Sequence, residues 1–160
     1  MSHLYLEQIE DYHRCRYNSI CLYAIMSYIQ YIENFNRSLK FLTKDLSKRY
    51  PNDAIVFRIQ KRIMAAIAID PLFVINAVGP YLYGYRDQIY AFDERFFLEN
   101  AFDVELKSAV NQEKVDMVSY LMPRVKECVR SLPADEKTEY ISLVVSLLDD
   151  YVEYLAAVRL

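Results

Sequence analysis

The sequence predicts an all-α protein: a single-domain multi-helix bundle of about six to eight helices over residues 1–160, with a buried C-terminal helix. Glycine supplies the positive φ angles of tight hairpin turns, and the chain has two glycines where average usage gives roughly 11. Several segments repeat apolar residues at helical spacing. Hydrophobic residues make up 54% of the 160 residues and charged residues 26%, which is typical of one globular domain with its own core.

The first third of the chain predicts three helices. An apolar stripe runs from Tyr17 to Glu33, and an earlier helix or turn covers 4–13. A second helix spans Arg37 to Arg49 and ends at Tyr50-Pro51, because the residue before proline disfavours the α region. Asp53 then caps a third helix that reaches residue 69.

The middle of the chain raises the question of a membrane span. The stretch from Ile63 to Tyr85 is 23 residues long with one charge, Asp70, which is long enough to cross a bilayer. However, Asp70 followed by Pro71 is typical of a helix N-cap and first turn. We therefore favour a buried helix-turn-helix over a membrane segment. Short helices follow at 71–78, 80–90 and 93–100, with a looser one at 102–110.

The C-terminal third predicts two long helices. The first runs from Gln112 to Arg130 and contains Pro123, where we expect a kink. Leu132-Pro133 separates it from a helix over 134–158. That last helix contains the run ISLVVSLL, which is apolar on most sides and indicates the buried centre of a bundle.

The sequence offers no recognisable chemistry. Its one Glu-x-x-His pattern, Glu10 to His13, lacks the second copy and the further glutamates that a di-iron bundle needs. We predict no catalytic residues, no metal site, no cofactor and no small-molecule substrate, hence not an enzyme. Three cysteines, Cys15, Cys21 and Cys128, favour free thiols in a reducing intracellular compartment such as the cytoplasm.

Charge is distributed unevenly. Residues 37–62 carry eight basic side chains against two acidic ones, whereas residues 87–120 carry eight acidic against three basic. The basic segment has three interpretations: a solvated face, pairing with a protein or within the fold, or nucleic-acid binding. The candidate nucleic-acid-binding residues are Arg37, Lys40, Lys44, Lys48, Arg58, Lys61 and Arg62. The first four are spaced by 3, 4 and 4 residues, which places them on one helical face.

Aromatic residues are the other signal. The chain has 15 tyrosines, eight phenylalanines and no tryptophan. A tyrosine ring with its polar tip suits partly buried interfaces, although core packing is the expected use of most of them. The candidate protein-interface residues are Tyr81, Tyr83, Tyr85, Tyr90 and Phe96. They predict a protein partner or self-association.

The segment YLYGYRDQIYAFDERFFLEN contains a helix-start signature, with Asp93 as cap and acidic Glu94 in the first turn. Over about residues 80–155 the chain resembles small helical proteins of large nucleocytoplasmic DNA viruses. The resemblance implies a virus-encoded protein, a minor virion component or assembly factor, and it carries over no catalytic or binding residue. The sequence therefore favours a non-enzymatic structural or protein-interaction module; the alternative is a nucleic-acid-binding module that uses the basic segment.

Overall fold

A computed structural model describes the backbone of residues 19–99 and 112–159, and the side chains of 26–99 and 119–159. Within these ranges the chain forms seven helices and no strand, which confirms the all-α prediction. The helices are α2 (Ser19–Arg49), α3 (Ala54–Ile69), α4 (Pro71–Gly84), α5 (Arg86–Tyr90), α6 (Glu94–Glu99), α8 (Gln112–Ser131) and α9 (Ala134–Val158).

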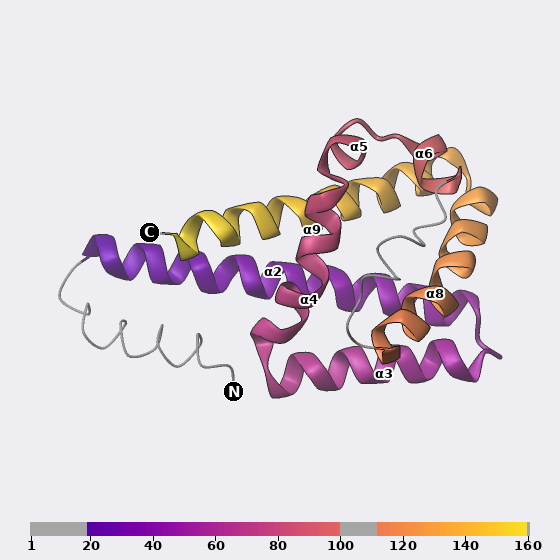
Figure 1. Cartoon of the computed structure of the whole chain (residues 1–160), viewed down its shortest axis with the longest axis horizontal. Coiled ribbons are helices and arrows are strands. Elements are labelled where there is room, and N and C mark those ends of the chain that lie inside the picture. The colour runs from indigo at the N-terminus through magenta and orange to yellow at the C-terminus, as the bar shows by residue number, and fades with distance from the viewer. Residues whose placement is uncertain (1–18, 100–111, 160) are drawn as a thin grey trace.

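Two long helices, α2 and α9, lie side by side along the length of the molecule (Figure 1). After α2 the chain turns and α3 runs back along it, and α4 then crosses both α2 and α9. The short helices α5 and α6 follow α4, and α5 contacts α9. At the other end α8 leads into α9. Helices α2 and α9 therefore share the centre of the contact network.

The main core lies where α2, α3, α4 and α9 meet. Its most deeply buried side chains are Phe35 from α2 and Leu72 and Ile75 from α4, and α9 contributes Leu147, Tyr151 and Tyr154. Helix α9 buries one face, which also includes Leu148. Burying a large apolar side chain is worth roughly 1.5–3 kcal/mol, so this shared cluster is what holds the four helices together.

A second, smaller cluster lies at the end of the molecule where α2 turns into α3. It consists of Leu46 from α2, Val56 from α3, and Cys128 and Leu132 from the end of α8 and the residue after it. Tyr50 from the turn packs against it and donates a hydrogen bond to the carbonyl of Arg124 (3.1 Å). This cluster fixes α8 against the α2–α3 corner.

Two predicted helix breaks are wrong. Helix α2 continues from Ser19 to Arg49 without a gap between the segments 17–33 and 37–49. Asn36, buried at 5% exposure, instead donates its amide to the carbonyl of Pro71 (2.9 Å), so a polar residue in mid-helix ties α2 to α4. Likewise α4 runs through Pro80 to Gly84 rather than stopping at Val78, and α5 begins only at Arg86.

The predicted helix caps are confirmed. Asp53 accepts hydrogen bonds from the amides of Ile55 and Val56 (3.1 Å each). Asp70 caps Leu72 (3.1 Å), and Asp93 caps Phe96 (2.9 Å). The predicted segments 4–13 and 102–110 lie outside the described residues.

Among the helices that the structure describes, none combines the length and the apolar composition needed to cross a bilayer. The stretch 63–85 is instead divided between α3 and α4 at the Asp70-Pro71 turn. The single-domain organisation over 1–160 stays a prediction.

Candidate interaction surfaces

The four predicted cations on α2, Arg37, Lys40, Lys44 and Lys48, form one exposed row on that helix, called the basic stripe below. Within the described part of the chain no ion pair involves any of the four. The acidic side chain in the same segment, Asp45, is occupied by Arg49, whose Nε lies 2.8 Å from its carboxylate. The basic stripe therefore presents positive charge to solvent that described acidic residues do not neutralise.

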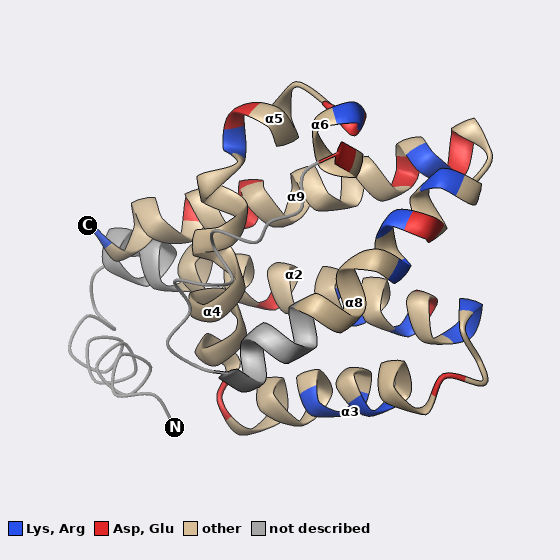
Figure 2. Cartoon of the chain, turned by 45° about the vertical axis from the view of Figure 1, so that its right-hand side comes forward, with Lys and Arg blue, Asp and Glu red and all other residues tan. Residues whose placement is uncertain are grey.

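The predicted cations on α3 are exposed as well. Arg58, Lys61 and Arg62 all lie on the outside of the helix, and the Lys61 ammonium sits over the ring of Phe57, 5.1 Å from its centroid. Figure 2 shows basic residues on both α2 and α3, the two helices joined at the Asp53 corner. The structure thus places all seven candidate nucleic-acid-binding residues at the surface on two neighbouring helices.

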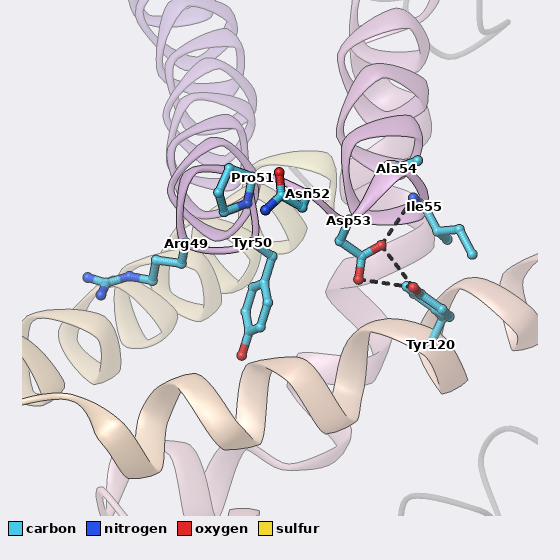
Figure 3. Close-up of a pocket in the computed structure, with 8 residues that line it drawn as sticks. All are labelled: Arg49, Tyr50, Pro51, Asn52, Asp53, Ala54, Ile55 and Tyr120. Atoms are coloured by element: carbon cyan, nitrogen blue, oxygen red, sulfur yellow. Dashed lines mark hydrogen bonds between the residues drawn. The ribbon is translucent and has the colours of Figure 1, made fainter.

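At that corner Asp53 has a structural use. Besides capping α3, it accepts a hydrogen bond from the Tyr120 hydroxyl (2.8 Å; Figure 3) and pairs with the Arg124 guanidinium (2.7 Å). Desolvation raises the pKa of Asp53, but the hydrogen bonds from Arg124, Tyr120 and the Val56 amide outweigh it and lower the pKa to about 2. A carboxylate held ionised in this way orients α8 on the corner and is a poor proton acceptor.

An open hollow of about 580 Å³ lies beside this network. Its walls are the α2–α3 turn, residues 49–55, and the Tyr120 ring (Figure 3). Its carboxylate, that of Asp53, is already fully engaged. The described residues also contain no group of three or more side chains that would hold a metal ion.

The predicted aromatic interface divides into two sets. Tyr85 and Phe96 are half-buried and pack on each other, with ring centroids 5.9 Å apart. Tyr81, Tyr83 and Tyr90 are exposed by 37%, 40% and 44%. Tyr81 and Tyr83 lie two positions apart on α4, and so about 200° apart around the helix, so they do not share one face.

Tyr83 and Tyr90 both reach α9. The Tyr83 ring meets Tyr151 edge-on at 6.3 Å, and the Tyr90 hydroxyl donates to Asp149 (2.8 Å). Desolvation, together with the hydrogen bond and charge of Asp149, raises the pKa of Tyr90 to about 12. These two rings are thus anchored on one edge and open to solvent on the other.

Four strongly exposed phenylalanines were not predicted as site residues: Phe41 at 59%, Phe57 at 52%, Phe73 at 50% and Phe92 at 49%. Phe57 and Met64 are seven residues apart on α3, which gives this helix an exposed apolar strip beside its core face. That spacing is visible in the sequence. Phe41 and Phe92 carry no comparable signal, because a single phenylalanine usually indicates core.

Phe92 also has an unusual backbone. It links α5 to α6 with a φ of 54°, in the left-handed region. Its amide bonds the Ile89 carbonyl (3.1 Å) and the Asp93 amide bonds the Gln88 carbonyl (3.0 Å). This is a Schellman helix end with phenylalanine where glycine is usual. A large apolar residue that is both strained and exposed favours a role in contacts.

Comparisons with known proteins show that the chain is similar to a viral protein. Uncharacterized protein H124R of African swine fever virus, isolate Pretoriuskop Pr4, is 27% identical over 128 residues, covering 80% of this chain and 94% of the relative. The same protein matches at 27% in the Badajoz strain and 26% in the Kenyan isolate KEN-50, with the same coverage. No protein-family model matches, and neither does any solved structure.

The match of 128 residues is longer than the segment 80–155 that carried the resemblance. The chain is therefore a distant homologue of a protein of a large nucleocytoplasmic DNA virus, as its sequence predicted.

Proposed function

We propose that the protein is a non-enzymatic structural module, a minor virion component or assembly factor, that associates with further copies of itself. The observation that carries this proposal is that one molecule has two exposed surfaces of complementary composition. The outer face of α3 is apolar and basic: Phe57 and Met64 are exposed beside Arg58 and Lys61.

The second surface, called the aromatic edge below, consists of Tyr83, Tyr90 and Phe92. Exposed carboxylates surround it, those of Asp87, Asp93, Asp149 and Glu153, although Arg86 also stacks on Tyr83 at 4.4 Å. An acidic aromatic surface complements a basic apolar one. Since the two surfaces differ, their contact is head-to-tail, and such contacts build rings or open chains suited to a structural role.

The test uses two charge-reversal variants. Arg58→Glu/Lys61→Glu makes the outer face of α3 acidic, and Asp87→Lys/Glu153→Lys makes the aromatic edge basic. Sedimentation velocity over a concentration series is expected to show association of the wild type, monomers for each variant alone, and restored association when the variants are mixed. Arg130→Glu/Arg159→Glu, placed on neither surface, is the control. A wild type that stays monomeric at all concentrations, or a mixture that stays monomeric, would sink the proposal.

A second candidate function is nucleic-acid binding. The specific observation that favours it is the basic stripe, whose four exposed cations have no described ion-pair partner. Each phosphate contact makes affinity depend on salt. Titration of labelled duplex and single-stranded DNA at low and near-physiological salt, with Lys40→Glu/Lys44→Glu/Lys48→Glu alongside, tests it. The expected result is salt-dependent binding that the variant loses; absence of binding at low salt rules it out.

A further inference from the structure

A groove between α2 and α9 lies beside the basic stripe. It encloses about 380 Å³ and is lined by Phe41 from α2 and by Thr138, Glu139, Ser142, Leu143 and Ser146 from α9. One wall is therefore an aromatic ring, exposed by 59%, and the other is rich in hydroxyl groups.

Phe41 belongs to the same side of α2 as the cations. It follows Arg37 by four residues, precedes Lys44 by three and precedes Lys48 by seven, which are the separations that place helical residues next to one another. The basic stripe extends about 16 Å along the helix, with successive cations about 4.5–6 Å apart along the axis, so it can contact several phosphates of one strand. A strand whose phosphates follow this stripe would pass the mouth of the groove.

We propose that this groove is a binding site for single-stranded nucleic acid, in which one base stacks on Phe41 while the phosphates contact the basic stripe. This inference rests on the second candidate function, nucleic-acid binding, and adds the form of the ligand and the residue that recognises it. Basic grooves interleaved with aromatic rings are how proteins hold single strands without sequence preference. A duplex keeps its bases stacked inside, so it would use the stripe alone.

The groove offers base and sugar groups suitable partners. The hydroxyls of Ser142, Ser146 and Thr138 are donors and acceptors for base edges or sugar oxygens; that of Thr138 also donates to the Ala134 carbonyl (2.9 Å). The Glu139 carboxylate is the one acidic group of the lining, and its negative charge would repel a phosphate at close range. Removing this charge is therefore expected to tighten binding, whereas removing a lysine is expected to weaken it.

The experiment is fluorescence anisotropy with a labelled ten-nucleotide single strand and with the corresponding duplex, over a series of salt concentrations. Phe41→Leu is compared with Phe73→Leu, which removes a comparably exposed ring on α4 (50%) that belongs to none of the proposed surfaces. We expect Phe41→Leu to weaken single-strand binding roughly 5- to 150-fold, with the salt slope and the duplex affinity unchanged. Phe73→Leu is expected to leave all three unchanged.

Charge variants complete the design. Lys40→Gln/Lys44→Gln/Lys48→Gln is expected to make the slope of log affinity against log salt shallower, from about −3 for four phosphate contacts to about −0.7 for one. Arg95→Gln/Arg130→Gln/Arg159→Gln removes the same charge elsewhere and is expected to keep the slope. Glu139→Gln is expected to tighten single-strand binding several-fold.

The outcomes separate the two ideas. If the lysine variant loses binding but Phe41→Leu behaves like Phe73→Leu, or if heparin, which has no bases, competes as well as the strand, the groove inference is wrong and the stripe remains an electrostatic surface. If the wild type binds neither strand nor duplex at low salt, both the groove and the second candidate function are wrong. Circular dichroism melts of each variant exclude unfolding as the cause of a loss.

Discussion

The backbone conformation of Phe92 is less favourable for phenylalanine than it would be for glycine. At the residue scale, a left-handed conformation in a residue with a Cβ is unfavourable by roughly 1–2 kcal/mol, and Phe92 has a φ of 54°. We expect Phe92→Gly to raise the free energy of unfolding by about 1 kcal/mol, measured by urea titration. Phe92→Ala, which also removes the exposed ring but keeps the Cβ, is the control. Equal stabilities of the two variants would contradict the strain.

The Asp150 carboxylate is expected to lower the stability of the fold by an amount that depends on pH. Desolvation, with a further contribution from the neighbouring Asp149 charge, raises the pKa of Asp150 to about 6. Its pKa in the unfolded chain is near 3.8, so between these values the folded state binds the extra proton and stability falls as pH rises. We expect Asp150→Asn to stabilise the fold by about 1–3 kcal/mol above pH 6 and by nothing below pH 4.

Chemical denaturation at several pH values checks this expectation. Glu153→Gln, which neutralises an exposed carboxylate on the same helix, serves as the control and is expected to change stability little at any pH. A gain for Asp150→Asn that is the same at pH 4 and pH 7 would show that the carboxyl is not destabilised by its surroundings.

At the scale of elements, the two glycines of α4 make a matched pair. A Cβ on Gly79 would overlap the Tyr151 ring, whereas a Cβ on Gly84 would meet nothing within 4 Å. We expect Gly79→Ala to lower the free energy of unfolding by about 1–3 kcal/mol. Gly84→Ala is expected to raise it by up to about 1 kcal/mol, because alanine restricts the unfolded chain.

Thermal melts of both variants and of Gly79→Ala/Tyr151→Leu provide the measurement. The double variant removes most of the ring that the new methyl group would meet, so part of the loss should return relative to Tyr151→Leu alone. If Gly79→Ala is as stable as Gly84→Ala, the close approach of α4 to α9 is not as described.

The elements also show what a sequence can and cannot reveal. Caps depend on one side chain and the next two or three amides, so Asp53, Asp70 and Asp93 were predictable. Contacts inside the core depend on tertiary partners: Asn36, in the middle of α2, donates a hydrogen bond to the Pro71 carbonyl at the start of α4, and no local pattern predicts that contact. The exposure of Phe41 likewise depends on where α9 lies, so the groove could not be found before the fold.

At the scale of the whole molecule, positive charge is concentrated on α2 and α3. Like charges spaced by four residues on a helix each destabilise it by about 0.2–0.5 kcal/mol, and Lys44 has such neighbours at Lys40 and Lys48. We expect Lys44→Gln to stabilise the fold by up to about 1 kcal/mol at low salt.

Screening at 1 M salt should remove this gain, because the Debye length falls to about 3 Å. Urea titrations at 10 mM and 1 M salt make the comparison. Lys137→Gln serves as the control. Because Lys137 forms an ion pair with Glu94 (3.0 Å), its replacement is not expected to raise the free energy of unfolding. A Lys44→Gln variant no more stable than the wild type at low salt would mean that the stripe is not under repulsion.

The aromatic core has a spectroscopic consequence. Tyr28 of α2 lies 5.3 Å from Tyr154 of α9, Tyr154 lies 6.2 Å from Tyr151, and Tyr151 lies 6.3 Å from Tyr83 of α4. With no tryptophan in the chain, tyrosine emission is not masked by a brighter indole, and rings this close exchange excitation. Emission anisotropy and near-ultraviolet dichroism would therefore report the mutual packing of α2, α4 and α9 in the unlabelled wild-type protein.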